Sequence, residues 1–285
     1  MAAAYIHFFL GIGVAYLFGY SGIEVLIVGL IGALQDMDAV SFLFYRQISR
    51  SRASELFMHR GITHTILFIA LMSGIVFFFH AILGLIILIN FSLHIFTDYV
   101  TSWGIAPFQP FSKKRYSLGL MTIYDIPLTA FSLFTALSGI LSFDVVWAFM
   151  VFFGYIGLRF LLKRRLPHRD LLVPVGNITY TFCIPEDDYT VGEIDIFGKI
   201  SQISIPRADS SIEPEIIEMI DSKIKESMLS HLLEYPVYTM EKGTIVIRDA
   251  RYSLFPKSSR FRFEIFFDKD TGTLFMELAG RRVDL

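Results

Sequence analysis

Apolar residues dominate the first 165 positions of the chain, where short polar interruptions separate six apolar segments. A hydrophobic stretch of about 20 residues is typical of a membrane-spanning helix. The pattern therefore predicts an all-α, polytopic membrane domain with about six helical crossings, of which the first two are short. The predicted helices cover residues 5–18, 23–35, 63–80, 85–100, 126–142 and 145–162.

Residues 5–35 allow two interpretations, because Gly19, Ser21 and Gly22 interrupt an otherwise apolar run. A single helix of this length would extend about 45 Å at 1.5 Å per residue, whereas the bilayer core is only about 30 Å thick. We favour a hairpin of two short helices, because it returns Asp36 to the side where the first helix begins. Such short helices would need a thinned or shielded bilayer.

Residues 166–285 have an ordinary mixed composition and predict a separate, small α+β domain in the cytosol, following a membrane domain of residues 1–165. Pro167 and Pro174 indicate a linker between the two. Apolar positions recur with helical spacing over residues 213–233. The expected strands are residues 177–184, 191–197, 200–205, 244–249, 260–268 and 273–279.

Charge divides the chain in the same way, although the overall net charge is only −2. Residues 1–165 carry 11 Lys and Arg against 7 Asp and Glu, whereas residues 166–285 carry 14 against 20. All 11 basic residues lie in or beside the loops 37–62 and 101–125 or at the exit 159–165. By the positive-inside rule these loops and both termini face the cytoplasm of a multi-pass plasma-membrane protein.

Other features of the composition exclude several classes. No basic stripe with interleaved aromatic residues indicates nucleic-acid binding. The single cysteine, Cys183, excludes a disulfide framework within the chain and a cysteine-rich zinc site. The N-terminus lacks the basic region and the small-residue cleavage site of a secretory signal.

The predicted topology brings a set of His and Asp residues to the cytoplasmic side. Ionisable groups at membrane depth are costly, so they suggest function. Mixed imidazole and carboxylate donors without cysteine suit zinc first, with manganese or iron as alternatives. The set is large enough for one or two divalent ions. The candidate ligands are His7, Asp36, Asp38, His59, His64, His94 and Asp98.

Two parts of this set have informative spacing. His94 and Asp98 are four residues apart on a predicted helix, so they share a face. They can bind one metal ion, or they can form a hydrogen-bonded pair that braces the helices. The segment from His59 to His64 reads HRGITH, with Thr63 as the expected N-cap of a helix that begins at His64. A corner between loop and helix can direct both histidines to one point.

Other polar residues carry open alternatives. Asp36 and Asp38 end a predicted helix, where acidic residues oppose the macrodipole, so cation binding is the better explanation. Arg60 can hold a phosphate or serve as a membrane anchor. Asp125 can be a metal ligand, a general base or the acid that starts a helix. Lys114 and Arg115 can hold an anionic headgroup or fix the topology.

These motifs resemble those of the YdjM-like family of membrane-bound proteins, which are described as metal-dependent hydrolases. The resemblance rests on His7, the Asp36-Met37-Asp38 pair, the HRGITH block and His94 with Asp98, and it covers about residues 1–130. Thr65 stands where the family often has Ser. The step from His94 to Asp98 is also similar to a motif of zinc-dependent phospholipases C, which implies a phosphoester substrate.

The sequence thus predicts a membrane metallohydrolase that cleaves a phosphoester of a lipid or another membrane-associated substrate at the cytoplasmic face. Arg60 would hold the phosphate and Asp125 would act as a base. The alternative is a metal-stabilised membrane scaffold or regulator whose C-terminal domain binds a cytosolic partner. The sequence leaves the oligomeric state open.

Overall fold

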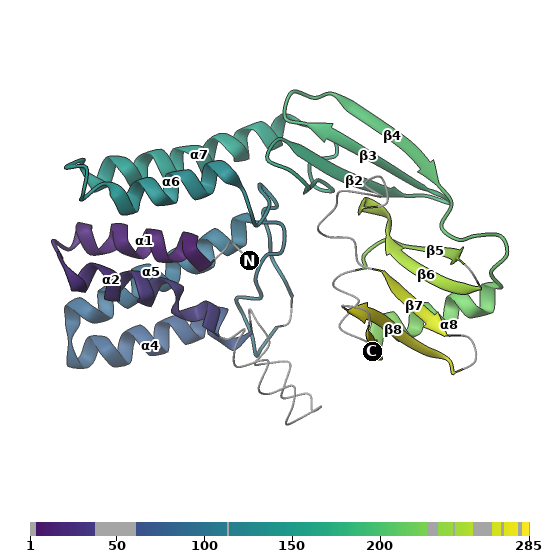
Figure 1. The fold of residues 1–285 in the computed structure, drawn as a ribbon, viewed down its shortest axis with the longest axis horizontal. Coiled ribbons are helices and arrows are strands. Elements are labelled where there is room, and N and C mark those ends of the chain that lie inside the picture. Colours follow the sequence, from purple (N-terminus) through teal and green to yellow (C-terminus); the bar gives the residue numbers. More distant parts are fainter. Residues whose placement is uncertain are drawn as a thin grey trace. The chain divides into compact units, whose positions relative to one another are not determined.

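The computed structural model describes residues 4–37, 61–112, 114–226, 233–241, 243–252, 264–268, 271–278 and 281–284 (Figure 1). The chain divides into two compact units. The first comprises Met1–Arg165 and Val173–Ile178, and the second comprises Leu166–Leu172 and Thr179–Leu285. Each unit is described by itself below.

Each of the six apolar segments forms a helix in the first unit, and the helices lie side by side in Figure 1. Their packed apolar faces form a core to which α1 contributes most, with Ile6, Leu10, Val14 and Ala15 almost fully buried. Of two short 3-10 helices, η1 (Leu34–Met37) directly follows α2, and η3 (Ile62–His64) directly precedes α4. The six helices are α1 (Ala4–Leu17), α2 (Ile23–Ala33), α4 (Ile66–Phe79), α5 (Ala81–Val100), α6 (Ile126–Leu137) and α7 (Val145–Arg165).

The prediction of about six crossings is not supported by the lengths of these helices. Among the described residues, only α5 and α7, with 20 and 21 residues, are long and apolar enough to span a membrane. A helix of 14 residues, such as α1 or α4, extends only about 21 Å at 1.5 Å per residue. The predicted helix 126–142 was too long, because α6 ends at Leu137 and a turn follows in which Ser142 has a φ of 53°.

The chain reverses between α1 and α2, as the hairpin interpretation predicts. Gly19 and Gly22 have φ values of 76° and 62°, which favour glycine because it has no Cβ. The two helices pack closely through small residues. A Cβ on Gly32 would lie 2.5 Å from the backbone oxygen of His7. This close approach brings the end of α2 and the following η1 against the start of α1.

The turns around α4 and α5 differ from the prediction. The prediction left residues 81–84 between two helices, but His80 alone separates α4 from α5, and its side chain accepts a hydrogen bond from Leu83 N. Thr63 is not the N-cap of α4. Thr65 has that role, because its hydroxyl accepts a hydrogen bond from Phe68 N at 3.1 Å. His64 therefore lies in the 3-10 turn before the helix.

In its described residues the second unit contains antiparallel strands, the α-helix α8 and a short 3-10 helix, η5 (Ala250–Tyr252). Strands β2 (Thr179–Pro185), β3 (Tyr189–Asp195) and β4 (Ile200–Ile205) pair in sequence order. Helix α8 (Pro214–Glu226) lies within the predicted helix 213–233, and the remaining residues 227–232 lie outside the described part. A further sheet follows in sequence order, with β5 (Pro236–Glu241), β6 (Thr244–Asp249), β7 (Ile265–Asp268), β8 (Thr273–Leu278) and β9 (Arg281–Asp284).

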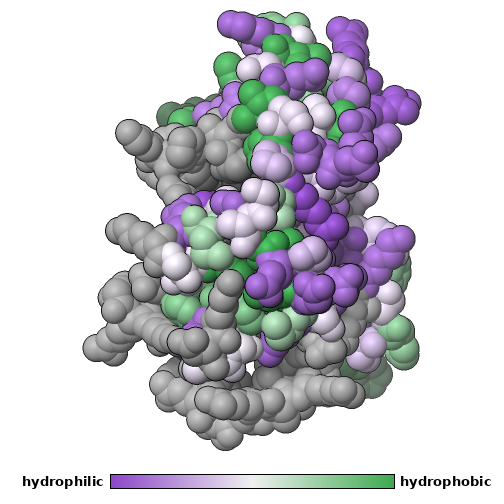
Figure 2. All heavy atoms as spheres, turned by 90° about the vertical axis from the view of Figure 1, so that its right-hand side faces the viewer, coloured by the Kyte–Doolittle hydropathy of each residue, from purple (hydrophilic) through white to green (hydrophobic). Residues whose placement is uncertain are grey.

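The predicted α+β class of this unit is confirmed, but strands β5 and β9 were missed. The sequence of β5 is PVYTME, in which only Val237 and Tyr238 are deeply buried, so its apolar alternation is weak. A two-residue strand, β1 (Val173–Pro174), lies in the segment that was expected to be a linker. Figure 2 views the side on which α8 and β5–β8 lie in Figure 1, and hydrophilic side chains cover much of the described surface there.

Candidate metal centre

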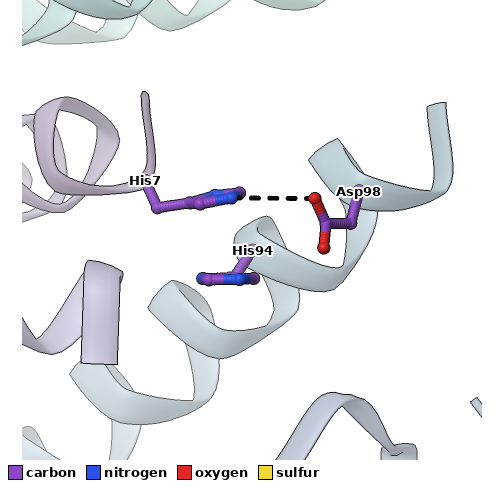
Figure 3. A group of neighbouring side chains, drawn as sticks. All are labelled: His7, His94 and Asp98. Carbon is purple, nitrogen blue, oxygen red and sulfur yellow. Dashed lines mark ion pairs between the residues drawn. The ribbon is translucent and has the colours of Figure 1, made fainter. Parts of the chain in front are cut away.

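Five of the predicted metal ligands meet in the first unit. They come from four separate segments: α1 provides His7, η1 Asp36, η3 His64, and α5 both His94 and Asp98. The three histidines and Asp98 are at most 2% exposed. Figure 3 shows His7 on one helix facing His94 and Asp98 on another. The fold therefore brings residues up to 91 positions apart into one buried polar cluster, called the His/Asp cluster below.

The nitrogen and oxygen atoms of the cluster face one another at similar separations. His7 Nε2 lies 3.8 Å from an oxygen of Asp36 and 3.8 Å from an oxygen of Asp98. His94 Nε2 lies 3.5 Å from Asp36 Oδ1, and His64 Nε2 lies 3.6 Å from Asp98 Oδ2. The two Nε2 atoms of His64 and His94 are 3.1 Å apart, which is within hydrogen-bond range when one of them carries a proton. The four nitrogen–oxygen separations exceed the usual hydrogen-bond range of about 2.7–3.2 Å.

The outer nitrogen of His94 determines which atom faces the cluster. His94 Nδ1 lies 2.9 Å from the backbone oxygen of Gly32. A carbonyl oxygen only accepts hydrogen bonds, so Nδ1 must carry the proton and donate it. In the neutral ring, Nε2 then presents a lone pair to Asp36 and His64. This arrangement, with one ring nitrogen bonded to a backbone carbonyl, is the usual way in which proteins orient a metal-binding histidine.

His7 is oriented in a similar way by a threonine. Its Nδ1 lies 3.1 Å from the hydroxyl oxygen of Thr97, which itself donates to the backbone oxygens of Leu93 and His94, both at 2.9 Å. Because the only hydroxyl proton points to those carbonyls, Thr97 accepts a hydrogen bond from His7 Nδ1. His7 Nε2 therefore turns a lone pair inward, and it makes no hydrogen bond with the described residues.

These features fit a divalent cation better than a network of hydrogen bonds. Two imidazole lone pairs and two carboxylates converge in a buried space, which is unfavourable without a positive charge among them. Ligand atoms in a tetrahedral shell, about 2.0–2.2 Å from one zinc ion, lie about 3.3–3.6 Å from each other. The separations of 3.1–3.8 Å in the cluster are close to this value.

The ligand atoms form two overlapping groups. One consists of His7, His94 and Asp98, and the other of Asp36, His64 and His94. Within each group the candidate ligand atoms lie within 4.8 Å of one another. His94 belongs to both groups, so the arrangement suits one ion with a large ligand set or two neighbouring ions.

The 3-10 helix η3, which carries His64, is hydrogen-bonded to η1 at the end of the first hairpin. Gln35, which is buried, donates from Nε2 to the backbone oxygen of Thr63 at 2.6 Å. His64 Nδ1 lies 3.0 Å from the hydroxyl of Thr63. Residues Gln35 and Asp36 thus fix the 3-10 turn and the cluster at the same time.

Three predicted site residues, Asp38, His59 and Arg60, lie outside the described residues. The neighbouring stretch Gly61–His64 is described, and it places only the second histidine of the HRGITH block in the cluster. The predicted roles of these three residues stay predictions.

Asp125 has a structural environment of its own. It is the N-cap of α6, and its Oδ1 accepts hydrogen bonds from Leu128 N at 2.9 Å and from the hydroxyl of Tyr155 at 2.8 Å. Its other oxygen lies 3.8 Å from Nη1 of Arg159. These partners of Asp125, namely Leu128, Tyr155 and Arg159, do not belong to the His/Asp cluster. Of the three alternatives, this geometry favours the acid that starts a helix.

Lys114 and Arg115 lie in the loop between α5 and α6. The ammonium group of Lys114 is 5.4 Å from the centre of the Tyr116 ring. Arg115 donates to the backbone oxygen of Gly104 at 3.2 Å. Neither residue has a described contact with the His/Asp cluster, so the structure leaves their proposed binding to a headgroup as a prediction.

Sequence reasoning missed Thr97 and Gly32, which orient the two histidines. Thr97 lies three residues after His94 and one before Asp98, and this position within the motif was a usable signal. Gly32 contributes only a backbone oxygen, and nothing in its side chain indicates that role.

The comparisons with known proteins agree with the positions of these motifs. Residues 1–166 match the family described as YdjM inner membrane protein. No curated protein and no solved structure matches the chain. The matched region holds the whole His/Asp cluster and all six apolar helices. The chain therefore belongs to the YdjM inner membrane protein family, which gives it a location in the membrane.

Proposed function

We propose that this chain is a membrane-embedded, metal-dependent hydrolase that cleaves a phosphoester of a lipid or another membrane-associated substrate. One observation carries the proposal: two histidines whose outer nitrogens are held by Gly32 and Thr97 direct their inner nitrogens at buried carboxylates. Such pre-orientation is typical of metal sites in enzymes.

In this proposal His7, Asp36, His64, His94 and Asp98 hold one or two divalent ions, zinc before manganese or iron. A divalent ion polarises a phosphoryl oxygen and makes water a stronger nucleophile near neutral pH. The residues of the chain keep the donor atoms in place and exclude bulk water, since four of the five are at most 2% exposed. A dry, pre-organised site strengthens electrostatic stabilisation of a transition state.

The proposed substrate contacts come from positively charged residues that lie next to η3 or in the loop after α5 in the sequence. Arg60 directly precedes the described Gly61, three positions before Thr63 and four before His64. A guanidinium can bind a phosphate with two parallel hydrogen bonds. Lys114 and Arg115 would attract an anionic headgroup at a cytoplasmic surface. We propose the cytoplasmic face because the basic residues of the first unit gather in the loops 37–62 and 101–125.

The first experiment measures metal content by mass spectrometry on the full chain, purified in detergent without chelator. We expect one or two divalent ions per chain in the wild type and their loss in both His94→Ala and Asp36→Ala. The matched control is His80→Asn, which removes a histidine outside the cluster and keeps a side chain that can cap α5. Absence of metal in the wild type, even after zinc or manganese is offered, would exclude the metal site.

The second experiment measures turnover with the same proteins. The probes are bis(p-nitrophenyl) phosphate and a short-chain phosphatidate in mixed micelles, each with added zinc or manganese. We expect turnover in the wild type and in His80→Asn, and none above background in His94→Ala. Equal rates in the wild type and in His94→Ala would show that the activity does not come from this cluster.

A metal-stabilised scaffold is the second candidate function. The deep burial of the ligands favours it, because structural metal sites are closed to solvent. The exposed strand β4, with Ile200 and Ile203 each more than 40% exposed, would offer a surface to a cytosolic partner. Bound metal that raises the melting temperature of the full chain, without turnover of either probe, would favour this function over the hydrolase.

A further inference from the structure

An apolar crevice of about 320 Å³ lies between α1, α5 and α7 in the first unit. Its lining is entirely hydrophobic, and the rim residues Leu17, Val146 and Phe153 are each more than 40% exposed. Ligand pockets usually hold about 300–1,000 Å³, so this one is small. A whole two-chain lipid is far larger. The lining residues are Val14, Leu17, Ile89, Leu93, Val146, Phe149 and Phe153.

The crevice and the His/Asp cluster lie on the same two helix faces. On α1, the residues Leu17, Val14, Leu10 and His7 are three or four positions apart, which places them along one stripe. The crevice uses the end with Leu17 and Val14, and the cluster uses the end with His7. Along α1, the distance from Val14 to His7 is about 10 Å at 1.5 Å per residue.

The second stripe runs along α5. Ile89, Leu93 and Thr97 are four positions apart and share a face. The first two line the crevice, and Thr97 orients His7. The hydroxyl of Thr97 also donates to the backbone oxygen of Leu93, one turn earlier on α5. The third wall comes from α7, where Phe153 packs 5.8 Å from the ring of Phe96 on α5.

The cluster and the crevice follow each other along the helices in the same order as the phosphate and the hydrocarbon of a membrane lipid. The cluster lies at the end of the bundle where α5 leads into the polar segment 101–125, and the crevice lies further along the same helices. A lipid has its phosphate at the membrane surface and its hydrocarbon further in. No charged or polar side chain lines the crevice, so only an apolar group fits it.

We propose that this crevice holds one hydrocarbon chain of a phosphorylated membrane lipid whose headgroup is bound at the His/Asp cluster. The assignment of the headgroup rests on the proposed function. The substrate class would then be lipid phosphoesters, and soluble phosphoesters would bind without the contribution of the crevice.

The test uses the full chain in nanodiscs of phosphatidylcholine with a small fraction of phosphatidate that carries a diazirine on one acyl chain. After irradiation and proteolysis, mass spectrometry locates the attached lipid. We expect several-fold more label on the α1, α5 and α7 peptides that line the crevice than on α4, whose residues Leu71 and Phe78 are also exposed. Even labelling of all exposed apolar helices would overturn the proposal.

Two variants and a matched control sharpen this test. Leu93→Phe and Leu17→Phe narrow the crevice at its wall and at its rim, so we expect each to lower the crevice label several-fold. Leu71→Phe makes the same change on the exposed face of α4 and should leave the label unchanged. Metal content checks the folding of each variant. Unchanged label in both narrowed variants with normal metal content would contradict the proposal.

The labelling does not depend on turnover, so its result can be separated from that of the hydrolase assays. Specific crevice labelling without turnover of phosphatidate would support the lipid site and count against the hydrolase. Turnover that is insensitive to acyl-chain length and to Leu17→Phe would support the hydrolase and exclude the crevice from substrate binding.

Discussion

His7 in the first unit and Asp249 in the second are both buried polar groups, but their surroundings differ. Asp249 accepts hydrogen bonds from the backbone nitrogens of Glu234, Tyr235 and Arg251 at 2.9–3.2 Å. It also accepts two from the guanidinium of Arg251, both at 2.8 Å. His7 Nε2 has two carboxylate oxygens at 3.8 Å and no hydrogen bond within the described residues.

The difference separates a structural network from a candidate ligand set. Asp249 meets only donors, and Arg251, which also donates to Glu234 at 2.5 Å, gives the buried carboxylate a counter-ion within the chain. Around His7 the inward-facing atoms include two lone pairs and two carboxylates, and a cation would balance them. Burial alone is therefore a poor sign of function, whereas burial of convergent acceptors points to a ligand that the chain must bind.

The largest effect should come from Asp98→Ala, which removes a carboxylate shared by His7 and His64. We expect the bound metal to fall below detection, because loss of even an orienting partner typically lowers metal affinity about 10–100-fold. Mass spectrometry of the purified chain measures it. Asp249→Ala should keep the full metal content, and equal loss in both variants would remove the distinction between the two buried groups.

Asp249→Ala should instead destabilise the second unit by about 3–5 kcal/mol, because it leaves the buried guanidinium of Arg251 without its main counter-ion. Hydrogen–deuterium exchange of β5 and β6 in the full chain measures this loss. The matched control is Asp187→Ala, since Asp187 is exposed in the turn between β2 and β3. Exchange as slow as in the control would show that the Asp249 network contributes little to the stability of the second unit.

Thr97→Val tests the orientation of His7. The isosteric change removes the hydroxyl that accepts from His7 Nδ1, and we expect metal affinity to fall about 10–100-fold. Titration of the apo protein with zinc measures the affinity. Thr181→Val is the control, because Thr181 is also buried and its hydroxyl donates to backbone oxygens, those of Gly192 and Arg251 in the second unit. If both variants bind zinc equally, the hydroxyl of Thr97 does not orient a ligand.

Gly32→Ala should have a smaller effect, on both stability and the metal site. Its Cβ would lie 2.5 Å from the backbone oxygen of His7, so α1 and α2 must move apart, at a cost of about 1–3 kcal/mol. The melting temperature of the full chain in detergent measures the loss. Gly74→Ala on α4 has open space around the new methyl group and should be neutral or slightly stabilising.

The smallest expected signal concerns Cys183, which lies close to the Asp249 network. Burial, and secondly the carboxylate of Asp249, raises the pKa of the Cys183 thiol to about 12. The reactive thiolate is therefore scarce at pH 8. We expect iodoacetamide to label the folded chain much more slowly than the chain unfolded in guanidinium chloride. Equal rates would mean that this part of the second unit opens readily.

Much of the fold could be predicted from apolar spacing. All six apolar segments of the first unit are helices, and the reversal near Gly19 and Gly22 follows from residues that tolerate positive φ. In the second unit, the strands with strong apolar alternation and the helix α8 with helical spacing were predicted. Strand β5 was missed, because Pro236, Thr239 and Glu241 interrupt the apolar alternation that would predict a strand. The segment gains its strand conformation from pairing with β6.

Helix ends could not be predicted in the same way. Thr63 was the expected cap of α4, but the local geometry selects Thr65, two residues later. Within the run 126–142, Ser138 and Gly139 directly follow the last residue of α6, but apolar residues resume at Ile140 and Leu141, so the end of the helix was missed. Length decides whether a helix can cross a membrane, so the number of crossings depended on these ends.

For the candidate site, the sequence by itself determined the ligand types and their positions near the ends of apolar segments, because His and Asp differ from the apolar residues around them. Only the tertiary structure decided which of them meet. It joined His7 to Thr97, 90 positions away, and tied Asp125 to Tyr155. The physical reason is that side-chain type is a local property, whereas convergence depends on close helix packing such as that at Gly32, and a backbone carbonyl that orients a histidine leaves no mark in the sequence.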